Sequence, residues 1–80
     1  MQSNEILRAI CEDAGIPMSR ASVLSGRSAL FIARYLSESK SPGTNVLAEI
    51  CNATNHDLLV RNRTTGREIV IDPPERSDDE

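Results

Sequence analysis

Four basic side chains gather in the middle of the chain, between residues 19 and 40. Arg20, Arg27, Arg34 and Lys40 stand there against one acid, Glu38, so the segment carries a net charge of +3. Guanidinium and ammonium groups bind phosphate oxygens through charge-assisted hydrogen bonds, and serine hydroxyls add neutral ones. The segment therefore predicts a surface that binds the phosphate backbone of a nucleic acid.

The formal net charge of the whole chain is −3, because acids concentrate at its C-terminal end. Five acids and one base lie between Asp72 and Glu80, which leaves eight bases and seven acids in residues 1–71. Acidic segments of this kind are typical of solvated interaction tails. We expect residues 73–80 to form an acidic, flexible tail that masks the basic character of the rest of the chain.

Other chemistry is not indicated by the sequence. Cys11 and Cys51 lie forty positions apart, and neither has a second Cys or His at a metal-ligand spacing. His56 stands beside Asp57 without a nucleophile motif, and the four glycines are too scattered to form a phosphate-binding loop. We expect two reduced thiols in the core, no metal, no cofactor and no enzymatic activity. The absence of a signal or membrane-spanning segment, together with reduced thiols, predicts a cytoplasmic protein with no membrane partner.

Helices must position the basic side chains, because apolar residues recur at the spacing of one buried helical face through most of the chain. Four segments have this pattern, at residues 3–14, 18–25, 29–37 and 44–51. Their N-caps are predicted to be side chains of Ser3 or Asn4, Ser28, and Thr44 or Asn45. Gly26 and Arg27 alone separate the second helix from the predicted cap of the third, so a tight turn joins these two helices.

The pattern changes to that of strands after the fourth helix. Residues 58–62 and 67–71 are aliphatic runs separated by Arg63-Thr64-Thr65-Gly66, which predicts a β-hairpin over residues 57–72. An isolated two-stranded hairpin is marginal in water, so we expect it to be the dimerisation element of a homodimer. The residues expected at this contact are Leu59, Arg61, Glu68 and Val70. The alternative is that the hairpin packs on the first and fourth helices of its own chain.

Several short motifs resemble the phage-repressor and Cro-like family, also called the XRE family, in one register without a gap. They are Gly15-Ile16-Pro17, Ser25-Gly26, Ile32, Arg34 and Ser41-Pro42. The resemblance covers about residues 5–55 and departs from the family at Met18, where Gln is common, and at Leu36, where Glu is usual. It implies a mostly α fold, in which a four- to five-helix lambda-repressor-like domain over residues 1–56 contains a helix-turn-helix and is followed by the hairpin.

The resemblance also implies a function. The protein would be a sequence-specific DNA-binding transcriptional regulator, a repressor, that acts as a homodimer with helix 29–37 in the major groove of double-stranded DNA. The base contacts implied are Ser28, Ala29, Leu30, Ala33 and Arg34. The phosphate contacts implied are Ser19, Arg20, Arg27, Ser39, Lys40 and Ser41.

Two alternative functions are compatible with the sequence. In the first, the protein is an antitoxin that represses its own promoter and binds a toxin through the acidic tail. In the second, it is a protein-interaction module without DNA binding, in which the apolar residues Ala29, Leu30 and Ala33 dock a protein helix.

Overall fold

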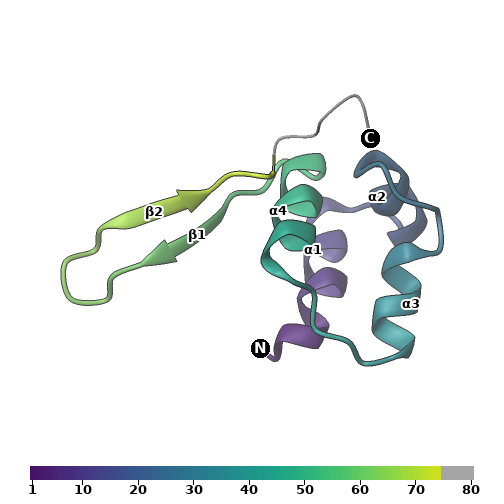
Figure 1. The fold of residues 1–80 in the computed structure, drawn as a ribbon, viewed down its shortest axis with the longest axis horizontal. Coiled ribbons are helices and arrows are strands. Elements are labelled where there is room, and N and C mark those ends of the chain that lie inside the picture. The colour runs from purple at the N-terminus through teal and green to yellow at the C-terminus, as the bar shows by residue number, and fades with distance from the viewer. Residues whose placement is uncertain (75–80) are drawn as a thin grey trace.

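The computed structural model describes residues 1–74 and consists of a helical body from which a β-hairpin projects (Figure 1). A short 3₁₀ turn, Ser3–Glu5, leads into the first helix. The four helices are α1 (Ile6–Ala14), α2 (Met18–Leu24), α3 (Phe31–Ser37) and α4 (Thr44–Ala53). The strands β1 (Leu58–Arg61) and β2 (Glu68–Ile71) follow. This element order confirms the predicted mostly α class with a C-terminal hairpin.

The core lies where the four helices meet, and each helix contributes at least one buried side chain. The fully or nearly fully buried residues of this cluster are Leu7, Ile10, Cys11, Ala21, Ile32, Ile50 and Cys51. Phe31, Tyr35 and Leu36 of α3 pack against it from its rim. Five of the seven buried residues are thus aliphatic and two are cysteines, and removal of their apolar area from water stabilises the fold.

The third helix begins two residues later than predicted. Residues 25–30 form an irregular turn, in which the Phe31 amide donates to the Ser28 carbonyl over 3.1 Å, and the helix starts at Phe31. Ala29 and Leu30 thus precede α3 instead of forming its first turn. The turn between the two helices is longer than the sequence indicated, because Ser28 does not cap the helix.

The predicted side-chain N-caps are wrong at α1, α3 and α4, none of which has a side-chain cap hydrogen bond. The 3₁₀ turn leads directly into α1, and Gly43 precedes α4 in an extended conformation. At its other end, α4 finishes in a defined turn. Asn55 adopts a left-handed φ of 64° and the His56 amide donates to the Cys51 carbonyl over 2.8 Å, which ends the helix sharply.

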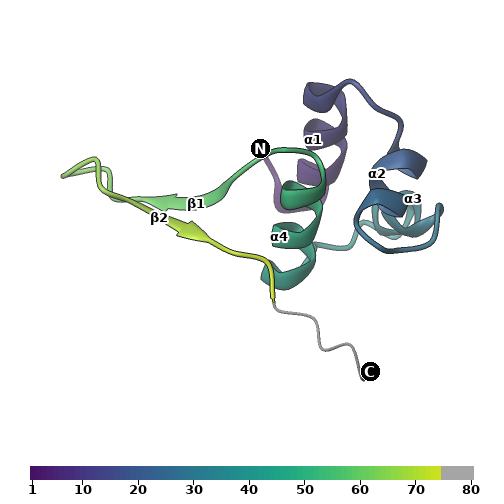
Figure 2. The same cartoon turned by 90° about the horizontal axis from the view of Figure 1, so that it is seen from above.

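The hairpin extends away from the helices, as both views of the ribbon show (Figures 1 and 2). Its strands are antiparallel and pair Leu58 with Ile71 and Arg61 with Glu68 at the two ends of the register. Leu58 at the base packs against the core, whereas Val60, Ile69 and Val70 are each more than half exposed. The alternative that the hairpin folds back onto α1 and α4 is therefore wrong beyond its base.

The acidic tail was predicted over residues 73–80, of which 75–80 lie outside the described residues. Pro73 and Pro74 are half-buried and border a shallow hollow with Leu24 at the end of α2 and Ala53 at the end of α4. Pro73 and Pro74, which were predicted to belong to the flexible tail, therefore lie against the helical body. No helix within residues 1–74 has the length and apolar character needed to cross a bilayer.

Candidate nucleic-acid interface

The buried hydroxyl of Ser22 joins α2 to α3. Its Oγ donates to the Met18 carbonyl one turn earlier in α2 over 2.8 Å and accepts the Ile32 amide of α3 over 3.1 Å. The Ile32 amide lies in the first turn of α3, where backbone donors have no partner within their own helix. A side chain from α2 therefore performs the capping that the sequence assigned to Ser28, and it sets the position of α3 relative to α2.

The end of α2 is held by a second set of hydrogen bonds. Gly26 has a φ of +85°, a left-handed conformation that side chains with a Cβ rarely adopt, and the next amide, that of Arg27, donates to the Ser22 carbonyl over 3.0 Å. The buried Ser25 hydroxyl donates to the same carbonyl over 2.8 Å. These hydrogen bonds thus fix the direction of the backbone where it leaves α2 and enters the turn toward α3.

Arg27 connects this turn to α3 and α4. Its guanidinium forms an ion pair with Glu49 of α4, whose side chain is only 11% exposed, and lies 4.8 Å from the centre of the Phe31 ring. These contacts use both the charge and the flat face of the group. The structure places the Arg27 guanidinium between the turn, α3 and α4, where its two contacts hold the turn in position, and its side chain is 32% exposed. The phosphate contact predicted for Arg27 stays a prediction.

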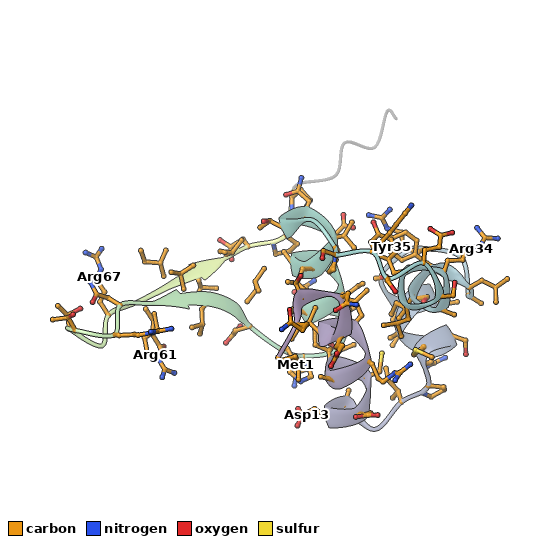
Figure 3. The ribbon with its side chains drawn as sticks, turned by 90° about the horizontal axis from the view of Figure 1, so that it is seen from below. Met1, Asp13, Arg34, Tyr35, Arg61 and Arg67 are labelled. Atoms are coloured by element: carbon orange, nitrogen blue, oxygen red, sulfur yellow. The ribbon has the colours of Figure 1, made fainter. Side chains whose placement is uncertain are left out.

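The outward face of α3 consists of Ala33, Arg34 and Ser37, and Leu30, the residue just before the helix, continues it at the spacing of one helical face. Leu30 is 58% exposed, Arg34 and Ser37 are exposed and Ala33 is half-buried. The Arg34 guanidinium has no hydrogen-bond or ion-pair partner among residues 1–74, and Figure 3 shows it at the edge of the molecule. We call these four residues the α3 face. It offers one long cationic donor beside small and apolar side chains.

The predicted base-contact residues divide into two groups. Leu30, Ala33 and Arg34 belong to the α3 face, whereas Ser28 and Ala29 lie in the preceding turn and are exposed. Three of the five residues thus precede α3 directly, and the other two lie on its outward side.

Apart from Arg27, the predicted phosphate-contact residues lie in α2 and in the segment that follows α3. Ser19 and Arg20 are exposed on α2, and the Arg20 guanidinium has no partner among the described residues. Lys40 follows α3, pairs with Glu38 over 3.1 Å, and lies 5.9 Å from the Tyr35 ring centre. Ser39 adopts a left-handed φ of 54°, and Ser41 Oγ lies 2.7 Å from Ser3 Oγ. Exposed cationic groups thus come from both α2 and the end of α3.

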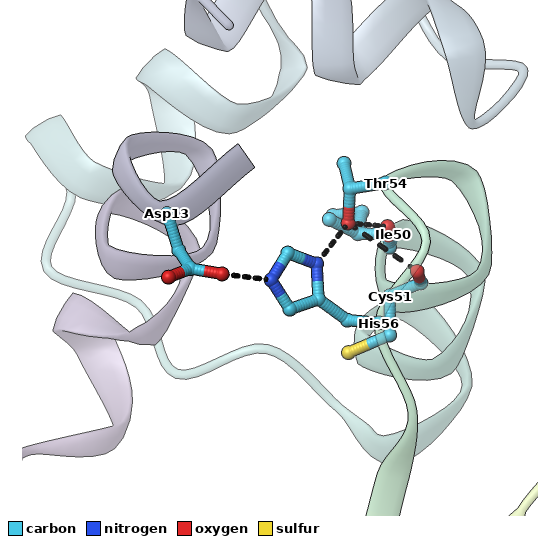
Figure 4. Close-up of polar contacts among 5 residues, drawn as sticks. All are labelled: Asp13, Ile50, Cys51, Thr54 and His56. Carbon is cyan, nitrogen blue, oxygen red and sulfur yellow. Dashed lines mark hydrogen bonds and ion pairs between the residues drawn. The ribbon is translucent and has the colours of Figure 1, made fainter. Parts of the chain in front are cut away.

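His56 links α1 to the end of α4 (Figure 4). Its Nε2 lies 2.7 Å from Asp13 Oδ2, and its Nδ1 lies 3.0 Å from the hydroxyl of Thr54, which also donates to the Ile50 carbonyl over 2.8 Å. Both ring nitrogens are occupied by structural partners. His56, whose sequence setting indicated no chemistry, therefore connects two helices in the structure.

Both cysteines are free thiols inside the core. Burial raises the pKa of Cys11 and of Cys51, and the neighbouring carboxylates Glu12 and Asp57 raise these pKa values further. Both thiols are consequently neutral and shielded at neutral pH, unlike a nucleophilic or metal-binding thiolate. Within residues 1–74, no three His, Cys, Asp or Glu side chains gather in a way that could hold a metal ion.

Ser22 and Glu49, which position the α2–α3 unit, were not predicted from the sequence. A signal for Ser22 was present, because residues 18, 21, 22 and 25 share the inward side of a helix at these spacings. Glu49 had no such signal, because an ion pair between residues 27 and 49 depends on how α4 packs against the turn.

Comparisons of the chain with protein-family models, with curated proteins and with solved structures found no match.

Proposed function

We propose that this protein is a sequence-specific DNA-binding transcriptional regulator, a repressor, in which α2 and α3 form a helix-turn-helix. In this proposal α3 lies in the major groove, α2 crosses the phosphate backbone, and two copies read two half-sites about 34 Å apart.

The observation that carries the proposal is that the exposed α3 face belongs to a helix pair whose inner side is held in place by hydrogen bonds and an ion pair. Ser22 and Arg27 fix the turn and the start of α3 from the inside, and Arg34 extends from the outside without a partner among the described residues. A major groove is wide enough for one helix, and a rigid support keeps such a helix in one register.

Charge supports the same orientation. Arg20 is exposed on α2 and Lys40 is exposed just after α3, so in this proposal both approach phosphates while Arg34 reaches a base edge. Arginine recognises guanine through two parallel hydrogen bonds, and Leu30 and Ala33 present methyl groups suited to thymine methyls. With one strong polar reader for each copy, much of the selectivity would come from DNA shape.

A second candidate function, protein binding by the α3 face, is favoured by Leu30, which is 58% exposed beside the small side chain of Ala33. An apolar contact of this kind is insensitive to salt, whereas phosphate binding weakens steeply as salt rises. The antitoxin alternative depends on the tail, most of which lies outside the described residues.

The test is fluorescence anisotropy with duplex DNA from the region upstream of the protein's own gene and with scrambled duplex of equal length, at several salt concentrations. We expect tighter binding to the native sequence, with an affinity that falls as salt rises. Arg34→Ala should remove about 1–3 kcal/mol of the preference for the native duplex, because it deletes the two-pronged base contact.

Arg63→Ala is the matched control, since it removes the same charge from the hairpin turn at the other end of the molecule. It should leave the sequence preference unchanged. Absence of binding to either duplex at low salt would overturn the DNA-binding proposal and favour the protein-binding function.

A further inference from the structure

Both edges of the β1–β2 hairpin are open as far as residues 1–74 show. The sheet has two strands within the described residues, and its outer part carries the exposed apolar side chains of Val60, Ile69 and Val70. Unpaired strand edges with apolar neighbours are templates for another strand.

The hydrogen-bond pattern of the hairpin identifies the backbone groups that point outward. The Asn62 amide donates to the Arg67 carbonyl over 2.8 Å, so residues 62 and 67 face each other as a bonded pair. Bonded and non-bonded pairs alternate along an antiparallel ladder, so Val60 and Leu58 also bond to β2. The amides and carbonyls of Leu59 and Arg61 therefore point away from β2, along the open edge of β1.

We infer that β1 pairs with β1 of a second copy of this chain, antiparallel about a two-fold axis that passes beside Leu59. The inference deepens the homodimer of the proposed function by naming its edge and register. Because Leu59 points its backbone groups outward, Leu59 and the partner's Leu59 would exchange both backbone hydrogen bonds.

The side chains that this register brings together are complementary on both sides of the axis. Leu59 faces the partner's Leu59, Leu58 faces the partner's Val60, and Asp57 faces the partner's Arg61. By the two-fold symmetry, the last two pairs occur twice. Directly opposite residues in such pairs have Cβ atoms about 5 Å apart, so apolar pairs exclude water and opposite charges attract.

Other registers lack this complementarity. An axis beside Val60 sets Leu59 against the partner's Arg61, and an axis beside Arg61 sets two arginines against each other. On the β2 edge, an axis beside Val70 opposes Glu68 and the partner's Asp72, which repel each other. An axis beside Ile69 sets Arg67 against the partner's Ile71. Among these registers, charge and apolar matching select β1 with the axis at Leu59.

The resulting sheet has four strands in the order β2-β1-β1-β2, and one of its faces is apolar throughout. Alternation along the strands puts Leu58, Val60, Ile69 and Ile71 of each copy on that face. The pairing sets the exposed Val60 of one copy beside Leu58 of the other, next to the partner's helical body. Of the four residues expected at the dimer contact, Leu59 and Arg61 lie on the pairing edge, and Glu68 and Val70 lie on the outer strands.

The first test uses Leu59→Cys in the full-length chain, oxidised with diamide and analysed on a non-reducing gel without DNA. Opposed Cα atoms in a bonded pair lie about 5.5 Å apart, within the range that a disulfide spans. Val70→Cys is the matched control, because Val70 is paired with Leu59 on the same hairpin face but lies on the other edge. We expect Leu59→Cys to form covalent dimers at least about tenfold faster than Val70→Cys.

The second test uses charge reversal, with the dimer dissociation constant measured by analytical ultracentrifugation. Arg61→Glu with Glu68→Arg keeps the cross-strand pair within the hairpin, now 3.0 Å between Arg61 Nε and Glu68 Oε2, but sets Glu against the partner's Asp57. We expect the dissociation constant to rise on the order of tenfold, because the repulsion occurs twice. Adding Asp57→Arg should restore it.

Equal cross-linking rates for the two cysteine variants, or a dissociation constant unaffected by the charge reversals, would overturn this register. Neither test contains DNA, so a failed pairing leaves the DNA-binding result standing. Conversely, a protein that pairs in this way without binding DNA would overturn only the proposed function.

Discussion

Single side chains in this protein divide into those that hold the α2–α3 unit from inside and those that extend from it. Ser22, Arg27 and His56 each contact two elements, whereas Arg20 and Arg34 have guanidinium groups without partners among the described residues. All three arginines belong to the basic segment that the sequence identified. Their environments, and hence their roles, differ because only Arg27 faces α4.

Replacement of Arg27 should therefore affect stability more than replacement of Arg20. We expect Arg27→Ala to lower the free energy of unfolding by about 1–2 kcal/mol, because it removes a largely shielded ion pair and the contact with the Phe31 ring. Arg20→Ala should change it by less than about 0.5 kcal/mol. Urea unfolding followed by circular dichroism measures both, and equal losses would contradict the positioning role of Arg27.

At the scale of elements, α3 depends on α2 for its start. The helix has seven residues and no side-chain cap of its own, so its first turn is completed by the Ser22 hydroxyl of α2. Short helices have little stability in isolation, and packing against a neighbour supplies most of it. α2 and α3 should consequently form and unfold together.

Ser22→Ala should lower the free energy of unfolding by about 2 kcal/mol, because it leaves the Ile32 amide without its acceptor in the interior. Ser19→Ala on the exposed side of the same helix is the control, with an expected change below about 0.5 kcal/mol. Chemical denaturation of the three proteins in parallel gives the comparison. A Ser22→Ala variant as stable as Ser19→Ala would show that the inter-helix hydrogen bond contributes little.

The whole molecule has basic groups at two opposite ends. Arg34 lies at one end and Arg61 and Arg67 at the other, with α1 and α4 between them (Figure 3). The hairpin from Leu58 to Ile71 has three arginines and one acid, whereas residues 75–80 have four acids and one arginine. The formal net charge of −3 is thus distributed unevenly along the chain. The positions of the charges, more than their sum, would determine the interaction of the protein with a polyanion such as DNA.

Removal of residues 75–80 makes the remaining chain formally neutral and should strengthen binding to scrambled duplex DNA several-fold at low salt. The gain should shrink as salt screens the charges. A full-length control with Gln or Asn in place of the four acids of this segment separates charge from length. Anisotropy titrations at two salt concentrations test this, and an unchanged affinity in both variants would show that the tail does not oppose DNA binding.

The sequence alone was sufficient to predict four helices followed by two strands in this order, because apolar spacing changes from that of helices to that of strands at Leu58. It also located the basic segment, because charge composition is local information. The first residues of the helices were harder to predict from the sequence. Ser28 is a residue type that often caps a helix, but the side chain that accepts a hydrogen bond from the first turn of α3 is Ser22, ten residues before Ile32.

Which basic side chains have partners and which are exposed depends on tertiary contacts. The pairing of Arg27 with Glu49, the link from His56 to Asp13, and the projection of the hairpin away from α1 and α4 all depend on contacts between residues far apart in the chain. Such contacts follow from how helices pack in three dimensions, and no local spacing encodes them. The residue types that contact a ligand can be listed from the sequence, but the packing of α4 against the α2–α3 turn determines which of them are free to do so.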